Sequence, residues 1–105
     1  MNQDVLNRLA QIIRARRDAD SETSYTRQLL DSGIERCAKK LGEESVETLI
    51  AAISQDDAAL KNEAADLLYH LLVLLEARGL ALDDVLKVLE ERMGESGLDE
   101  KARRG

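Results

Sequence analysis

The chain has 105 residues, the usual size of one domain, which leaves little room for a second core. Pro, Phe and Trp are absent and only two Tyr occur, a composition that disfavours strands and favours an all-α domain. The net charge of −6 argues against general binding to nucleic acid, and a single Cys and a single His rule out an internal disulfide and a Cys/His zinc site within one chain.

The sequence contains no predicted membrane span or secretory signal. Its most apolar stretch, residues 67–75, is too short to cross a bilayer, and residues 1–17 lack an uninterrupted apolar segment. We therefore expect a soluble, cytoplasmic protein whose partner is a small molecule rather than nucleic acid or membrane. Because small cores of Leu, Ile, Val and Ala often gain buried area by oligomerising, we also expect a homodimer.

Hydrophobic periodicity predicts three helices in the first half of the chain. The first covers about residues 2–17, and a short second helix, N-capped by Ser24, runs through Asp31. Gly33 suits the left-handed residue that follows a helix end, so a long third helix is expected over residues 34–53. The positions of this helix that should face the core are Ile34, Ala38, Leu41, Ser45, Thr48, Leu49 and Ala52.

Two more helices are predicted in the second half. A polar turn at residues 54–57 precedes a fourth helix over residues 60–77, whose later half is apolar on nearly every side and should be central in a bundle or in a dimer interface. Asp83 or Asp84 can cap a fifth helix that ends near residue 93. The predicted organisation is a four- to five-helix bundle over residues 1–93, completed by dimerisation, with a polar tail over residues 94–105.

The third helix carries acidic side chains beside its core-facing positions. At roughly 100° per residue, Glu44 lies about 60° from Leu41 and Glu47 about 120° on the same side, with Lys40 between them. Glu43 and Glu47 are like charges at i and i+4, an arrangement that loses ~0.2–0.5 kcal/mol. A face selected only for solubility would avoid this arrangement.

The fourth helix carries a second acidic group. Glu63 and Asp66 are about 60° apart on the helix, and His70 falls between their directions one turn later. Since one turn joins the two helices, both groups should border the same leucine surface. Four carboxylates there would suit a hard, oxygen-seeking cation such as Mg²⁺. The residues alone leave two interpretations open, a magnesium site and a solvated acidic face.

Several motifs resemble a known enzyme family. Glu-Glu-x-x-Glu at residues 43–47, followed by Glu-x-x-Asp at residues 63–66 on the next helix, resembles the MazG-like superfamily of all-α nucleoside triphosphate pyrophosphatases. The segments that narrow the resemblance to the phosphoribosyl-ATP pyrophosphohydrolases of histidine biosynthesis are residues 24–26, 40–44, 63–72 and 96–102. The resemblance covers nearly the whole chain.

This resemblance implies hydrolysis of phosphoribosyl-ATP to phosphoribosyl-AMP and pyrophosphate with Mg²⁺ as cofactor. The implied metal ligands are Glu44, Glu47, Glu63 and Asp66, which with Glu43 as a further ligand or base make up the implied catalytic set. The implied substrate-binding residues are Lys40, Arg16, Ser24, Tyr25, Thr26 and His70. Helix capping by Ser24, a surface role for Lys40 and simple burial of His70 are the structural alternatives.

Two other functions compete with this one. An enzyme of the same superfamily could instead remove free or damaged nucleoside triphosphates from the nucleotide pool. A non-catalytic helical dimerisation module, with solvated acidic faces, is the alternative from a different class.

Overall fold

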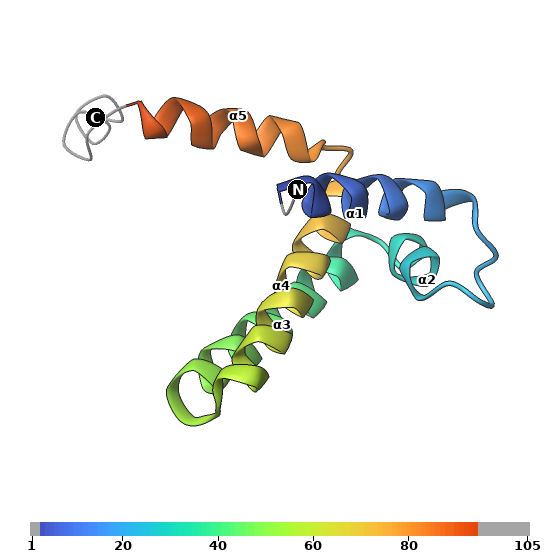
Figure 1. Ribbon diagram of the computed structural model, residues 1–105. Coiled ribbons are helices and arrows are strands. Elements are labelled where there is room, and N and C mark those ends of the chain that lie inside the picture. Colours follow the sequence, from blue (N-terminus) through green and yellow to red (C-terminus); the bar gives the residue numbers. More distant parts are fainter. Residues whose placement is uncertain (1–2, 95–105) are drawn as a thin grey trace.

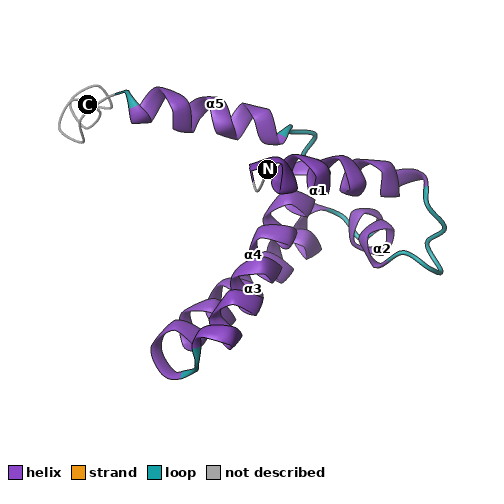
Figure 2. Ribbon diagram, viewed as in Figure 1, coloured by secondary structure: helices purple, strands orange, loops and turns teal. Residues whose placement is uncertain are grey.

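Five α-helices and one short 3-10 helix make up the computed structural model, which describes residues 3–94 (Figures 1 and 2). In chain order they are α1 (Gln3–Ala15), η1 (Arg16–Asp18), α2 (Tyr25–Asp31), α3 (Ile34–Ser54), α4 (Asp57–Ala77) and α5 (Leu82–Met93). No strand occurs between residues 3 and 94, so the all-α expectation is confirmed. None of these helices combines the length and apolarity needed to cross a membrane. Of the predicted tail, residues 95–105 lie outside the described residues.

Local capping signals set the ends of the central helices. The Oγ of Ser24 accepts a hydrogen bond from the backbone N–H of Arg27 at 3.1 Å, which starts α2. Gly33, at a φ of 95°, occupies the left-handed region and separates α2 from α3 as expected. The carboxylate of Asp56 accepts the N–H of Ala59 at 2.8 Å, so α4 begins at residue 57 rather than at the predicted residue 60.

The start of α5 also differs from the prediction. The helix begins at Leu82, with Ala81 as its N-cap, whereas Asp83 or Asp84 was expected to precede it. The Asp84 carboxylate instead accepts the backbone N–H of Ala81 at 3.1 Å from inside the first turn. Asp84 therefore stabilises a helix start that lies upstream of it, at Leu82.

The core lies where α1, α2, α3 and α4 meet. Its buried members are Ile13, Leu29, Cys37, Leu72 and Val73. As expected from its leucine-rich second half, α4 is central and packs against each of the other three helices. The four helices thus pack together at one end of the α3–α4 hairpin, whose other end extends away from α1 and α2 (Figure 1).

One buried charge ties the N-terminal helix to α4. Glu76 is only 8% exposed, and its Oε1 lies 3.3 Å from the Nε of Arg14. Arg17 pairs with the other carboxylate oxygen and also donates to the backbone carbonyl of Glu76. Because a buried carboxylate is tolerated when it is paired and hydrogen-bonded, these arginines fix α1 and η1 against the end of α4.

The face that α3 turns toward α4 is only partly the one that the sequence periodicity predicted, because Leu41, Ser45 and Thr48 are half-buried as expected and the other four positions are exposed. The buried or half-buried positions of this helix are Cys37, Lys40, Leu41, Glu44, Ser45, Thr48 and Ala51. Leu49, expected in the core, is 62% exposed, and Ile34, Ala38 and Ala52 are exposed as well. Small side chains such as Cys37 and Ala51 suit a close approach of two helices, which leaves larger aliphatic side chains outside.

Those outer side chains form a continuous apolar surface, here called the α3 stripe. It consists of Val46, Leu49, Ile50 and Ile53, of which Ile53 is 85% exposed. The helix α5 adds further uncovered apolar side chains, Val88, Leu89 and Met93. Apart from Leu82, which packs against the core, α5 extends away from the four packed helices and makes few contacts with them (Figure 1).

Candidate active site

Three carboxylates from two neighbouring helices come together in the α3–α4 hairpin. Glu44 from α3 and Glu63 and Asp66 from α4 each offer one oxygen, and these oxygens lie within 4.8 Å of one another. Glu44 and Glu63 are half-buried and Asp66 is exposed. The predicted convergence of the two acidic groups therefore occurs for these three residues, which we call the carboxylate cluster.

Glu44 is the member of the cluster with the least access to water. It lies in the same line of α3 as Leu41 and Ala51, facing α4, and its Oε2 is buried with no hydrogen-bond partner among the described residues. Desolvation raises the pKa of this carboxyl, and the neighbouring Glu47 and Asp66 raise it further. A buried carboxylate oxygen that lacks a donor fits a bound cation, since a cation would supply the missing partner.

Glu47 lies beside the cluster without being one of its three members. It is exposed on α3 and close enough to share a hydrogen bond with Glu63, and this contact is the largest cause of the raised pKa of Glu63. Burial of Glu63 and the charges of Glu44 and Asp66 act in the same direction. The role of Glu47 as a fourth ligand stays a prediction.

Glu43 points to a different partner. Its Oε1 lies 3.2 Å from the Nζ of Lys40, one turn earlier on α3. This ion pair raises the pKa of Lys40, and the phenol of Tyr25 adds a smaller contribution, which places Tyr25 near the same ammonium group. Glu43 thus holds Lys40 instead of joining the cluster, and its predicted catalytic role remains untested.

His70 is buried behind the cluster with a defined orientation. His70 is 7% exposed, and its Nδ1 lies 2.9 Å from the backbone carbonyl oxygen of Asp66. Because a carbonyl can only accept, Nδ1 is the nitrogen that donates, and in the neutral ring Nε2 carries the free lone pair. This Nε2 is buried and finds no partner in the described part of the chain.

Two tyrosines continue the site from His70 toward α2. The Tyr69 ring packs edge-on against His70 at a centroid distance of 5.0 Å, and Tyr25, which is 51% exposed, stacks on Tyr69 at 6.5 Å. The hydroxyls of Thr26 and Tyr69 are hydrogen-bonded to each other. Burial raises the pKa of Tyr69, and this hydrogen bond and the nearby charge of Arg16 partly offset that rise.

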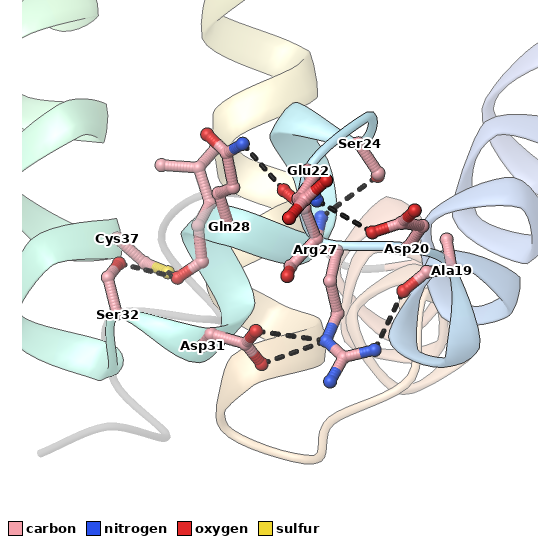
Figure 3. Close-up of polar contacts among 11 residues, drawn as sticks. Ala19, Asp20, Glu22, Ser24, Arg27, Gln28, Asp31, Ser32 and Cys37 are labelled. Atoms are coloured by element: carbon pink, nitrogen blue, oxygen red, sulfur yellow. Dashed lines mark hydrogen bonds and ion pairs between the residues drawn. The ribbon is translucent and has the colours of Figure 1, made fainter.

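Ser24 has a structural role at the start of α2. It is 5% exposed, and its hydroxyl caps the helix (Figure 3). The guanidinium of Arg27 binds the carboxylate of Asp31 at 3.0 Å and the carbonyl of Ala19 at 2.7 Å, which holds the preceding loop in place. The capping alternative is confirmed for Ser24, and its predicted contact with substrate stays a prediction. Through the cap, Ser24 fixes the neighbouring Tyr25.

Two residues of this site, Tyr69 and Thr48, were not predicted from the sequence as functional. Tyr69 follows Asp66 by three residues, and Thr48 follows Glu44 by four, so helical spacing alone places both beside an acidic position. The signal was present in the sequence, but nothing distinguished these side chains from ordinary core-facing ones.

The fold and the carboxylate cluster define an all-α protein with a candidate cation site inside a helical hairpin. The family model described as phosphoribosyl-ATP pyrophosphohydrolase matches residues 6–93. A protein of Bradyrhizobium diazoefficiens named phosphoribosyl-ATP pyrophosphatase 1 is 59% identical over 91% of this chain and 91% of its own length. Proteins named phosphoribosyl-ATP pyrophosphatase from Cereibacter sphaeroides (54% identical; 96% of this chain and 98% of the relative) and Paracoccus denitrificans (56%; 94% and 92%) match as well. The chain belongs to the phosphoribosyl-ATP pyrophosphohydrolase family.

Proposed function

We propose that this chain hydrolyses phosphoribosyl-ATP to phosphoribosyl-AMP and pyrophosphate, cleaving between the α and β phosphates, as a step of histidine biosynthesis. The observation that carries the proposal is the carboxylate cluster of Glu44, Glu63 and Asp66, which lies inside the segment matched by the family model. The relatives named for this activity align over nearly the whole chain, the cluster included.

The cluster is proposed to hold Mg²⁺, with Glu47 as an additional ligand. The donor set supports a hard cation, because it consists of carboxylate oxygens and includes the unpartnered Oε2 of Glu44. Mg²⁺ bound there would neutralise phosphate charge and lower the pKa of a coordinated water. Glu44 and Glu63 project from the interior of α3 and α4, which pack against each other.

Lys40 and the residues around Tyr25 are proposed to bind the rest of the substrate. The ammonium of Lys40, held by Glu43, would pair with phosphate oxygens next to the cluster. The exposed ring of Tyr25 offers a flat surface beside the site, and the Nε2 of His70, which has no partner among residues 3–94, offers an acceptor. Thr26, Arg16 and Ser24 complete the proposed substrate-binding set, Ser24 through its position under Tyr25.

The enzyme is proposed to act in the cytoplasm as a homodimer, with residues 1–93 as the catalytic domain and residues 94–105 as a tail. The α3 stripe and the outer face of α5 support the dimer, because exposed apolar surface of this extent is unusual in a monomer. Both surfaces lie away from the seam between α3 and α4, so a partner could cover them and leave the carboxylate cluster accessible.

The decisive experiment is a substrate comparison with and without Mg²⁺. The protein is incubated with phosphoribosyl-ATP, ATP and dATP, and pyrophosphate and the monophosphate product are quantified. We expect Mg²⁺-dependent release of pyrophosphate and phosphoribosyl-AMP, and a kcat/KM for phosphoribosyl-ATP well above that for ATP or dATP. Glu63→Gln should lower kcat/KM by about 100-fold or more, since it removes a proposed ligand.

Glu90→Gln is the matched control, because Glu90 is an exposed carboxylate on α5, outside the cluster. It should retain full turnover. Preference for a simple nucleoside triphosphate would replace the proposal with a nucleotide-pool enzyme of the same superfamily. Absence of turnover with every triphosphate would favour the dimerisation module.

A further inference from the structure

Thr48 makes a contact that the other hydroxyls of α3 do not make. Its Oγ1 lies 2.8 Å from the carbonyl oxygen of Glu44 on its own helix and 3.2 Å from the carbonyl oxygen of Glu63 on α4. Ser45 and Ser54 bond only to the carbonyl one turn earlier on α3, at 2.9 Å each. Hydroxyls that bond back to their own helix are common, but the second acceptor makes Thr48 a link between two helices.

The two acceptors of Thr48 belong to members of the carboxylate cluster. The backbone carbonyls come from Glu44 and Glu63, whose side chains meet from opposite sides of the seam. Because a hydroxyl carries a single proton, Thr48 shares that proton between the two carbonyls or alternates between them. Either arrangement fixes the position of α3 along the axis of α4, next to the residues that form the cluster.

This link opposes a force that the cluster itself creates. Without a cation, the carboxylates of Glu44 and Glu63 repel each other across the seam, and Glu44 is also partly desolvated. Repulsion of this kind favours sliding or separation of the helices. A half-buried hydroxyl that bonds to both backbones resists such movement without adding another charge.

We infer that Thr48 is a positioning residue that holds Glu44 and Glu63 at cation-binding distance before any cation arrives. The inference rests on the proposed function, since it assumes that the cluster binds a divalent cation. Thr48 is not one of the proposed ligands, because its hydroxyl is used by the carbonyls of Glu44 and Glu63. It acts by keeping the carboxylate oxygens in place, so that less ordering is needed when the cation binds.

The test measures binding of Mn²⁺ alone, without nucleotide, because Mn²⁺ accepts the same oxygen ligands as Mg²⁺ and is detected directly by electron paramagnetic resonance. Thr48→Val removes the hydroxyl and keeps the shape, whereas Thr48→Ser keeps the hydroxyl. Loss of one hydrogen bond at this point should weaken Mn²⁺ binding by about three- to tenfold in Thr48→Val. Thr48→Ser should stay within about twofold of the unaltered protein.

Ser45→Ala is the matched control, because it removes a hydroxyl that bonds only within α3. Its Mn²⁺ affinity should not change. Thermal unfolding with and without Mn²⁺ gives an independent readout: the increase in Tm caused by Mn²⁺ should be smaller in Thr48→Val than in Ser45→Ala. If Thr48→Val fails to fold, Thr48→Ala carries the same expectation.

The outcomes separate the inference from the proposed function. If the unaltered protein binds no Mn²⁺, the proposed metal site is wrong and the inference fails with it. If the unaltered protein binds Mn²⁺ and Thr48→Val binds it equally well, only the inference fails. Equal weakening in Thr48→Ser and Thr48→Val would also overturn the inference, because packing rather than the hydroxyl would then be responsible.

Discussion

Glu44 occupies a position that the α3–α4 seam fills elsewhere with small or apolar side chains. Cys37, Leu41 and Ala51 lie in the same line of α3, and an apolar residue at position 44 would pack there without desolvating a charge. The raised pKa of Glu44 reflects the unfavourable desolvation of its charged form. A locally unfavourable side chain in an otherwise well-packed seam is typical of a functional site, where stability is sacrificed for chemistry.

The cluster predicts how stability depends on pH in the absence of metal. The pKa values of Glu44 and Glu63 are raised in the folded protein. At pH values between the ordinary and the raised pKa, these two groups therefore bind more protons in the folded state than in the unfolded state. The contribution of Glu44 and Glu63 to the free energy of unfolding in EDTA should therefore be fully present below about pH 4.3, the ordinary glutamate pKa, and be lost as pH rises through their raised pKa values. Urea unfolding at a series of pH values measures this dependence.

Glu47→Gln should make the decline of the unfolding free energy with rising pH smaller. Glu47 contributes to the raised pKa of both Glu44 and Glu63, and Gln removes its charge at nearly constant size. Glu90→Gln is the comparison, because it removes an exposed charge on α5 and should leave the decline unchanged. A decline of the same size in Glu47→Gln and the unaltered protein would show that Glu47 does not control the titration of the cluster.

Helical spacing was enough to predict that the two acidic groups converge, because the 3.6-residue period fixes which side chains share a face. It was not enough to show that Glu43 pairs with Lys40, that Glu47 lies outside the three-residue cluster, or that Glu44 is the buried member. The pairing of Glu43 with Lys40 and the burial of Glu44 depend on how far α3 is rotated against α4, and that rotation is set by close packing of the two helices.

At the scale of elements, two opposite sides of α3 contribute to two different surfaces of the molecule. One side carries the seam and the cluster, and the opposite side carries the α3 stripe from Val46 to Ile53. Periodicity could not choose between the two sides, because both contain apolar residues at helical spacing. The capping signals were more reliable, because Ser24 and Gly33 marked their helix boundaries correctly. The start of α4 was predicted three residues late, because the polar turn at residues 54–57 does not show which of its residues caps the helix. The structure identifies this cap as Asp56.

The cap of α4 gives a prediction about stability alone. Asp56→Ala removes the acceptor for the Ala59 N–H and should lower the free energy of unfolding by about 1 kcal/mol. Turnover per folded molecule should be retained, since Glu63 lies two turns further along the helix. Urea unfolding and a turnover assay measure the two effects. Asp56→Asn should retain most of the stability, because Asn caps equally well. An equal loss in both variants would contradict a capping role.

At the scale of the molecule, the apolar surfaces that the four packed helices leave uncovered are the main departure from a self-contained domain. The composition predicted an all-α fold and the leucine-rich α4 predicted its centre, and both are confirmed. The separate course of α5 could not be predicted, because periodicity shows which side of a helix is apolar and not what covers it.

The α3 stripe predicts how the proposed dimer can be broken. Leu49→Glu places a charge in the middle of the stripe, and the dissociation constant should rise by about tenfold or more, measured by sedimentation velocity over a range of concentrations. Ala58→Glu is the control, because Ala58 is an exposed alanine of α4 and lies outside the stripe. A monomeric unaltered protein, or a Leu49→Glu variant that dimerises normally, would be inconsistent with this interface.

All three members of the carboxylate cluster come from the single hairpin that α3 and α4 form, between Glu44 and Asp66. Contacts between residues close in sequence form with little loss of chain entropy, so this hairpin can assemble early in folding. A cation that binds the cluster would then stabilise the transition state for folding as well as the native state. The proposed cation would thereby also accelerate the formation of the hairpin that holds it.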